Sequence, residues 1–431
     1  MERIRTANKW ILFLVTLICP PFGMALALFY LYNSDDNWKT CIFCVAYAMA
    51  IFAYCYEPTV DSDLVRYREI MAQIQNKSFF DAVNSGIYGE GNLYVFMALC
   101  WLLGNIGQPN FLQAISVFFV MLIAGYINYK IATDNAISYK ESFATLIFII
   151  LNASFYNLTN SVRNILAFII IFYAVFRDVY LKKKDVITII LYVAPCFMHA
   201  SAILLVMFRF VISITSKIKW GLLVLIIMMK TIVGYLASFF STIGGSNIVL
   251  KLVENMLIKG NRYYNNYNSA WAITASSSGS MRLMKILLVL ECIIITAFIF
   301  KRSSMSKSGV ALSDFSSKLY ERMKLIDYLF LVDVMGFACV PMHMPEYWRF
   351  LVVVILFNGV ILLGNEIDFT NNVFYLLRKC LFLITPLYFA LWVRDLILYS
   401  KPLSMILKAF ACNPVILILN GKNWIFETLF V

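Results

Sequence analysis

The stretch DSDLVRYRE, residues 61–69, places five charged side chains within nine positions of a chain that is 61% hydrophobic and only 14% charged. On a helix, Asp63 lies one turn from Arg66 and Tyr67, so its carboxylate can hold the guanidinium group in a fixed direction. A planar, permanently charged guanidinium group suits phosphate oxygens. One interpretation is an anion site, and the alternative is an ion pair that only closes the end of a helix.

Polar residues recur where later apolar segments begin or end. The sequence NSVRNILAF contains Asn160, Arg163 and Asn164, CFMHASA contains His199 beside Ser201, and VPMHMPEYWRF contains His343, Glu346 and Arg349. Arg163 could be an anchor at the lipid interface, and His199 a hydrogen-bonded packing residue. Glu346 and Arg349, three positions apart, could simply neutralise each other. Each of these motifs, taken alone, could therefore have only a structural role.

An aromatic and amide-rich stretch lies farther along the chain. It contains Arg262, Tyr263, Tyr264, Asn265, Asn266 and Tyr267. Tyrosine rings offer flat apolar faces to sugars, and amides offer hydrogen bonds. Interfacial anchoring of the tyrosines is the alternative.

The elements that must position these residues are membrane helices. The mean hydropathy is +0.78, and apolar runs of 15 to 23 residues recur along the whole chain. Backbone amides in hydrocarbon must be satisfied within each segment, which excludes an open sheet, and the runs lack the alternation of a barrel. We expect an all-α polytopic membrane protein with about 11–14 membrane helices, including re-entrant or interfacial segments, in a single integral membrane domain, residues 1–431.

The expected segments are 10–32, 39–56, 92–106, 111–130, 141–158, 163–180, 186–198, 200–215, 220–240, 283–300, 325–342, 346–363, 373–393 and 403–420. The first of these contains a Pro20-Pro21 break and no cleavage site, so we expect a retained hairpin rather than a cleaved signal.

The charges in the connections predict sidedness. Basic connections at the N-terminus, at 177–185, at 216–219 and at 301–324 are expected in the cytoplasm. The connection 57–91 has six acidic and three basic residues and is expected outside, as is 241–282, each with an interfacial helix. This arrangement requires the segment 92–106 to enter the membrane without crossing it.

Composition excludes several classes of protein. The net charge of +12 is confined to short connections, which does not favour nucleic acid. The ten cysteines lie mostly inside apolar stretches, so neither a disulfide framework nor a zinc site is supported. Two histidines are too few for a multi-histidine metal centre. We expect neither a metal nor a cofactor.

The polar clusters all lie on the expected external face, and together they indicate which kind of ligand the protein binds. Arg66, Arg163 and Arg349 come from widely separated segments, and each is costly to bury without an anionic partner. We expect the interiors of the spans to be nearly free of charge, with Lys230 as one exception, whereas a transporter should show a deep cationic path. The inferred ligand is a phosphorylated amphiphile at the external interface.

The motifs DLVRY, NSVRNILAF with the following KKK turn, and MHASAIL occur in an order that resembles the Wzy/EpsG-like polysaccharide polymerases, with a looser match at PEYWRF. The resemblance implies a GT-C-type membrane glycosyltransferase that joins undecaprenyl-diphosphate-linked repeat units of O-antigen, capsule or exopolysaccharide without a nucleotide sugar. It also implies the outer face of a bacterial inner membrane, with a flippase and a chain-length regulator as partners.

As a hypothesis, the acceptor hydroxyl attacks the anomeric carbon of the donor glycan while diphosphate leaves. Arg163 and Arg66 would bind the diphosphate with help from Arg349, and Asp63 would orient Arg66. His199 is the first choice of base and Glu346 the second.

The remaining site residues would contact substrate: Tyr67, Asn160, Asn164, His343, Arg262, Tyr263, Tyr264 and Tyr267. A flippase or transporter of the same glycan is the alternative, and a ligase shares the donor chemistry.

Overall fold

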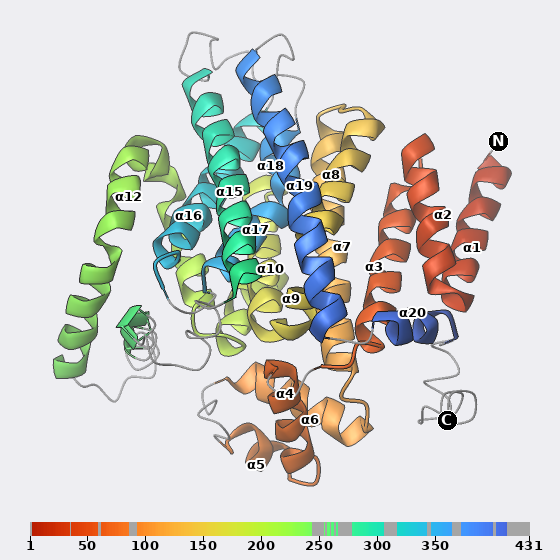
Figure 1. Cartoon of the computed structure of the whole chain (residues 1–431), viewed down its shortest axis with the longest axis horizontal. Coiled ribbons are helices and arrows are strands. Elements are labelled where there is room, and N and C mark those ends of the chain that lie inside the picture. Colours follow the sequence, from red (N-terminus) through yellow and green to blue (C-terminus); the bar gives the residue numbers. More distant parts are fainter. Residues whose placement is uncertain are drawn as a thin grey trace. The chain divides into compact units, whose positions relative to one another are not determined.

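The computed structural model describes residues 2–34, 36–58, 62–85, 93–243, 278–305, 317–342, 346–363, 372–399 and 402–411, and single positions between 254 and 265. Every regular element in these residues is a helix, as Figure 1 shows. The prediction of an all-α polytopic membrane protein is confirmed.

Three helices in the described residues are long and apolar enough to cross a membrane: Phe111–Asp134, Gly279–Phe300 and Leu376–Leu398. A fourth span is possible if Lys217–Leu225 and Met228–Thr242, which meet at an angle of 77°, count as one. Five shorter apolar helices accompany them. The expected count of 11–14 membrane helices stays a prediction.

The chain divides into two compact units, and each is described by itself. The first comprises Met1–Ile170, Leu363–Asn365 and Trp392–Val431. The second comprises Ile171–Leu362 and Glu366–Leu391. Two long helices, α10 (Val162–Val175) and α19 (Asn372–Tyr399), contribute residues to both.

The first unit is built on closely packed helices: α1 (Glu2–Ile18), α2 (Pro20–Asn33), α3 (Trp38–Tyr54), α7 (Phe111–Asp134) and α8 (Tyr139–Asn152). The predicted break at Pro20-Pro21 is observed, because these prolines open α2 directly after α1 ends. Small residues let the backbones approach. A Cβ on Gly125 of α7 would come within 2.7 Å of the Ile42 side chain of α3.

Short helices complete the first unit: α4 (Asp63–Ile74), α5 (Phe79–Val83), α6 (Tyr94–Ile106), α9 (Phe155–Asn160) and α20 (Pro402–Ala411). Figure 1 shows α4, α5 and α6 as one group. Helix α4 buries one face through Leu64, Tyr67, Ile70, Met71 and Ile74, the spacing of an amphipathic helix. The 57–91 connection therefore contains a helix, and its place at the outer interface stays a prediction.

The second unit contains η2 (Phe176–Tyr180, a π-helix), α11 (Val186–Val193), η3 (Ala194–Phe197, a 3₁₀-helix), α12 (Ala202–Ile243), α15 (Gly279–Met305), α16 (Ser317–Cys339), α17 (Glu346–Leu356) and α18 (Asn358–Leu362). Helix α16 packs closely on α17, since a Cβ on Gly336 would overlap the Leu351 side chain. Apart from single positions, most of the 241–282 connection lies outside the described residues.

Three basic connections meet along the first turns of α16. Lys182 forms an ion pair of 3.1 Å with Glu321, and Lys219 forms one of 2.8 Å with Asp327. Lys324, from the 301–324 connection, lines a pocket with Lys182. Connections 177–185, 216–219 and 301–324 thus share one region of the second unit, as a common side of the membrane requires.

The expectation that the spans carry almost no charge apart from Lys230 is wrong. Glu291 in α15 and Asp333 in α16 are both fully buried. Thr385 donates to Glu291 at 3.4 Å, and Thr296 donates to Asp333. A carboxyl group flanked by apolar neighbours leaves little trace in an averaged hydropathy, so these two acids were overlooked. Lys230 itself is exposed.

Candidate functional site

The N-terminal turn of α4 presents the ion pair that its sequence predicts. The Ser62 hydroxyl caps the helix by accepting from the Val65 amide at 3.4 Å. Arg66 Nη2 lies 3.1 Å from Asp63 Oδ1, and the two side chains are 37% and 39% exposed. This exposure leaves both groups accessible to a ligand. Asp63 fixes the direction of the Arg66 guanidinium group, as the i, i+3 spacing indicates.

Two arginines from distant segments share one tyrosine ring. The Cζ of Arg66 lies 5.5 Å from the ring centroid of Tyr67, and the Cζ of Arg163 lies 5.8 Å from the same centroid. Their separation therefore cannot exceed the sum of these distances. Arg163 also lies 5.4 Å from the ring centroid of Phe96.

The rings beneath the arginines are fixed by burial. Tyr67 and Phe96 are 1% and 0% exposed and meet edge to face, with centroids 4.9 Å apart. Arg163 is itself only 9% exposed, in the first turn of α10. A buried aromatic pair thus places one deep and one accessible guanidinium group together, and each gains a favourable cation–π contact.

A second polar group lies beside this platform. Asn160 Nδ2 donates to the hydroxyl of Tyr56 at 3.0 Å and to the carbonyl of Tyr156 at 2.8 Å. Gln113 of α7 holds the Tyr56 backbone by donating to its carbonyl at 2.9 Å. Asn164 is also buried, in the first turns of α10.

Arg68 is a site residue that the sequence analysis missed. Its Nη2 donates to Asn110 Oδ1 at 2.8 Å. Burial lowers the pKa of Arg68, while Glu57 and Tyr56 oppose that shift. The available signal was its spacing, because Arg68 lies four positions after Leu64 and three before Met71, on the apolar side of α4.

His199 lies in the second unit, in the turn between η3 and α12. Its Nδ1 lies 2.7 Å from the Ser201 hydroxyl, and its backbone amide donates to the Pro195 carbonyl at 3.0 Å. The hydroxyl fixes the orientation of the imidazole ring. This arrangement suits a positioned base, and it equally satisfies a packing histidine.

Glu346 and Arg349 form an ion pair in the first turn of α17. Lys285 of α15 lies nearby, because its Nζ donates to the Val340 carbonyl and lies 4.8 Å from the ring centroid of Tyr347. Sequence reasoning missed Lys285, which lies inside an apolar run. This end of the second unit therefore holds two cations and one carboxylate.

We compared the chain with models of known protein families to find the family to which it belongs. The model of the EpsG family matches residues 39–403. The chain belongs to the EpsG family. The comparisons with curated proteins and with solved structures found no match. Membership of the EpsG family confirms the resemblance and indicates a polysaccharide polymerase-type role in a membrane.

The structure describes part of the aromatic stretch that the sequence proposes as a sugar contact. Tyr264 is 2% exposed, and its hydroxyl donates to the Ala338 carbonyl at 2.6 Å. Its ring and hydroxyl are therefore committed to packing on the end of α16. Arg262 and Asn265 are exposed. Tyr263, Asn266, Tyr267 and His343 lie outside the described residues.

The geometry supports anion binding in the first unit. Arg66 and Arg163 are brought together on Tyr67, with Asp63 and Asn160 close by in the same unit. Arg349, Glu346 and His199 belong to the second unit and are placed only within it. Among the described residues, no group of three or more His, Cys, Asp or Glu side chains could hold a metal ion.

Proposed function

We propose that this EpsG family protein joins oligosaccharide repeat units carried on undecaprenyl diphosphate, at the outer face of a bacterial inner membrane. The observation that supports the proposal most directly is the sharing of the Tyr67 ring by Arg66 and Arg163. A diphosphate carries adjacent negative groups, and two guanidinium groups held near one ring match its charge.

The proposed reaction transfers the growing glycan from its lipid diphosphate to a fresh lipid-linked repeat unit. The acceptor hydroxyl oxygen forms a bond to the anomeric carbon, and the bond from that carbon to the diphosphate oxygen breaks. The hydroxyl proton passes to a base, and undecaprenyl diphosphate leaves. Negative charge grows on the leaving oxygens, so Arg66 and Arg163 stabilise the transition state more than the ground state.

The two arginines have different parts in this proposal. Arg163, which is nearly buried and held over two rings, supplies a preorganised charge. Arg66, which is more exposed and paired with Asp63, meets the incoming headgroup. Preorganisation matters because a group that is already oriented costs nothing further to reorganise during reaction.

His199 remains the first candidate for the base, because Ser201 fixes its ring. Glu346 is the second candidate, and its pairing with Arg349 already engages its carboxylate. Arg349, Asn160, Asn164, Arg262 and the tyrosines at 263 and 267 remain proposed contacts to the glycan or its diphosphate. Tyr264 is removed from that set, because its side chain is buried.

A flippase of the same glycan is a second candidate, favoured by one observation. The buried carboxyl groups of Glu291 and Asp333 are of the kind that proton-driven transporters use. The surface glycan of a deletion strain separates the classes. A single capped repeat indicates a polymerase, long chains that stay on the carrier indicate a ligase, and units trapped in the cytoplasm indicate a flippase.

The decisive experiment is polymerisation in vitro with purified lipid-linked repeat units. We expect Arg66→Ala or Arg163→Ala to lower the rate by about 10²-fold or more. Arg394→Ala is the matched control, since Arg394 is an exposed arginine whose side chain is 51% accessible. Undiminished elongation by the Arg66→Ala/Arg163→Ala double variant would overturn the proposed diphosphate site.

A further inference from the structure

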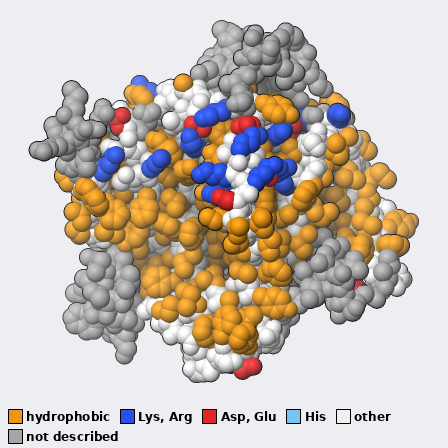
Figure 2. Space-filling model, turned by 180° about the vertical axis from the view of Figure 1, so that it is seen from behind, with side chains coloured by type: hydrophobic (Ala, Val, Ile, Leu, Met, Phe, Trp, Pro, Cys, Tyr) orange, Lys and Arg blue, Asp and Glu red, His pale blue; other side chains and the backbone are white. Residues whose placement is uncertain are grey.

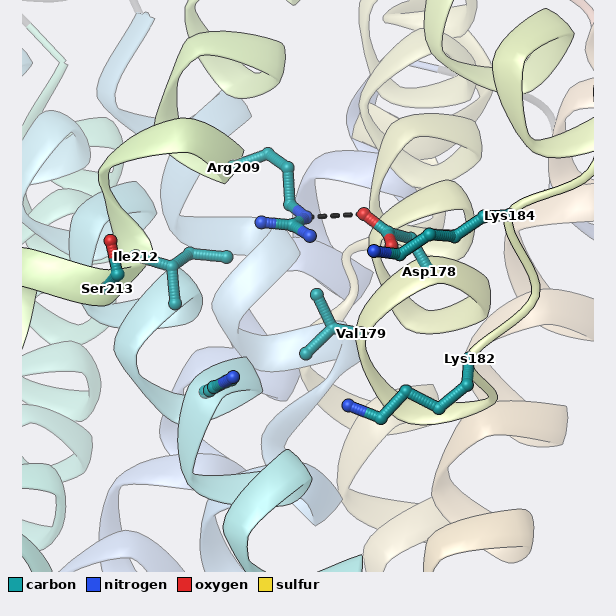
Figure 3. Close-up of a pocket in the computed structure, with 8 residues that line it drawn as sticks. Asp178, Val179, Lys182, Lys184, Arg209, Ile212 and Ser213 are labelled. Atoms are coloured by element: carbon teal, nitrogen blue, oxygen red, sulfur yellow. Dashed lines mark hydrogen bonds and ion pairs between the residues drawn. The ribbon is translucent and has the colours of Figure 1, made fainter.

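A basic pocket lies in the second unit, between η2, the turn that follows it, α12 and α16, as Figure 3 shows. Its volume is about 140 Å³. It is lined by Asp178, Val179, Lys182, Lys184, Arg209, Ile212, Ser213 and Lys324. Pockets that enclose whole drug-sized molecules measure roughly 300–1,000 Å³. This pocket therefore suits a small anionic headgroup rather than a glycan.

Asp178 lines the pocket and is only 8% exposed. Its Oδ2 accepts from Arg209 Nε at 2.6 Å and from the Tyr192 hydroxyl at 3.3 Å. Its Oδ1 is buried and has no hydrogen-bond partner in the described part of the chain. Oδ1 is therefore an unsatisfied acceptor on a residue that lines the pocket, and a hydroxyl group of a ligand would satisfy it.

The turn that carries the lysines is held in an unusual conformation. Lys182 has a φ of +58°, in the left-handed region that favours glycine and costs free energy for a side chain. The Lys183 amide donates to the Arg177 carbonyl at 2.8 Å. Asp185 caps α11 through the Thr188 amide at 2.9 Å and pairs with Arg177 at 2.7 Å. These contacts fix the backbone that presents Lys182 and Lys184, and strain of this kind often marks a functional position.

Apolar side chains project from the elements beside the pocket. Val186 and Ile187, which open α11 directly after the lysine turn, are 70% and 58% exposed. On α12, Phe210 and Met207 are 78% and 53% exposed, next to the Arg209 position. Figure 2 shows that Lys and Arg side chains gather at the border of a broad field of hydrophobic side chains. Basic residues beside exposed apolar side chains match a lipid headgroup with its acyl chains attached. Free phosphate would need only the basic residues.

We propose that the pocket binds the phosphodiester headgroup of an anionic glycerophospholipid such as phosphatidylglycerol. The phosphate lies beside Lys184 and Lys324 and shares Lys182 with Glu321, its ion-pair partner, and a glycerol hydroxyl donates to Asp178 Oδ1. The acyl chains run along the exposed face of α11. The proposal goes beyond the polymerase assignment and does not depend on it, because the pocket uses none of the residues proposed for the diphosphate.

The test measures lipid binding to the purified full-length protein by native mass spectrometry, with dioleoyl phosphatidylglycerol and dioleoyl phosphatidylcholine as probes. A basic residue near an anionic lipid contributes about fivefold in affinity. We therefore expect Lys184→Ala or Lys324→Ala to weaken phosphatidylglycerol binding about fivefold. Lys183→Ala is the matched control, since Lys183 is exposed in the same turn and does not line the pocket. Its affinity should stay within twofold of the wild type.

A second variant distinguishes a loss of lipid binding from a loss of folding. Lys184→Gln removes a pocket charge at an exposed position and keeps a side chain of similar length, so it should bind phosphatidylglycerol less tightly while its melting temperature does not fall. An equal loss of phosphatidylglycerol binding in Lys183→Ala would show that binding depends only on diffuse surface charge, and this result would overturn the proposal. Equal binding of phosphatidylcholine would also overturn it. Competition by soluble glycerol 1-phosphate as effective as that by phosphatidylglycerol would show a free-phosphate site instead.

Discussion

Arg163, at the start of α10, lies over the ring of Tyr67, in α4, with 5.8 Å between Cζ and the ring centroid. These residues are far apart in the sequence and meet because α4 turns its apolar face toward the segment that begins α10. The tyrosine thus has two neighbours with formal charge, Arg163 and Arg66. Removing the ring should loosen both guanidinium groups while leaving their charges in the chain.

Tyr67→Leu is therefore a direct test of positioning by the ring. We expect it to lower the polymerisation rate by about tenfold, equivalent to about 1.4 kcal/mol, which lies within the range of partly buried cation–π contacts. Tyr67→Phe keeps the ring and should have a clearly smaller effect. The comparison is made on detergent-purified protein with melting temperatures measured in parallel. Equal rates for the two variants would contradict a role for the ring.

The hydrogen bond between Arg68 and Asn110 gives a prediction about stability. Removal of the acceptor in Asn110→Ala should destabilise the protein by about 1.5–3 kcal/mol, because a half-buried guanidinium group loses a partner. Asn110→Asp restores an acceptor and should recover most of the loss. Asn105→Ala serves as the control, because its exposed side chain bonds only within its own helix. Unfolding in denaturant measures the differences, and equal effects of Asn110→Ala and Asn105→Ala would count against the bond.

Asp185 caps α11 with its carboxylate, so the stability of the protein should depend on pH. Its hydrogen bonds from the Thr188 amide and hydroxyl, followed by Arg177, lower the pKa of Asp185 to about 2. A carboxyl group with a lowered pKa stabilises the fold above its unfolded pKa of about 3.8, and this contribution is lost as the pH falls through about 2.

We therefore expect the melting temperature of Asp185→Ala to lie below that of the wild type by a constant amount from pH 8 to pH 5. The gap should narrow as the pH approaches 2. A gap that does not change over this range would show that the carboxylate charge has no part in the cap.

The close approach of α3 and α7 predicts the effect of a single methyl group. Gly125→Ala would place a Cβ 2.7 Å from the Ile42 side chain, so we expect a loss of about 1–3 kcal/mol. Ile42→Ala in the same chain should recover part of it. Gly221→Ala in α12, where no atom lies within 4 Å, should be neutral or slightly stabilising. Resistance to thermal unfolding gives the order of these variants, and equal stability of the two glycine variants would contradict the packing.

Local features of the sequence predicted much of the fold. The prolines at 20 and 21 break the first segment as expected, and Asp63 pairs with Arg66 at the spacing that their helix provides. Three of the four basic connections, 177–185, 216–219 and 301–324, also meet in the second unit. In each case the physical cause acts within a few residues, or acts on every basic segment alike, so the sequence alone carries the signal.

The features that the sequence did not predict depend on contacts between distant segments. The shared ring of Tyr67, the role of Arg68 and the approach of Lys285 to Tyr347 have no local signature. Glu291 and Asp333 were overlooked because one carboxyl group scarcely changes the hydropathy of an apolar segment. The sequence proposes Tyr264 as a sugar contact, yet its hydroxyl donates to a carbonyl of α16, far along the chain.

The π-helical segment η2 has a consequence for how this protein can be altered. The amide of Leu181 donates to the carbonyl of Phe176, five positions earlier, so this turn contains one residue more than an α-helical turn. Omitting one residue between 176 and 180 would let the α-helix continue and would rotate the following side chains by about 100°. Lys182 and Lys184 follow this turn, so the additional residue contributes to the direction in which they approach the pocket.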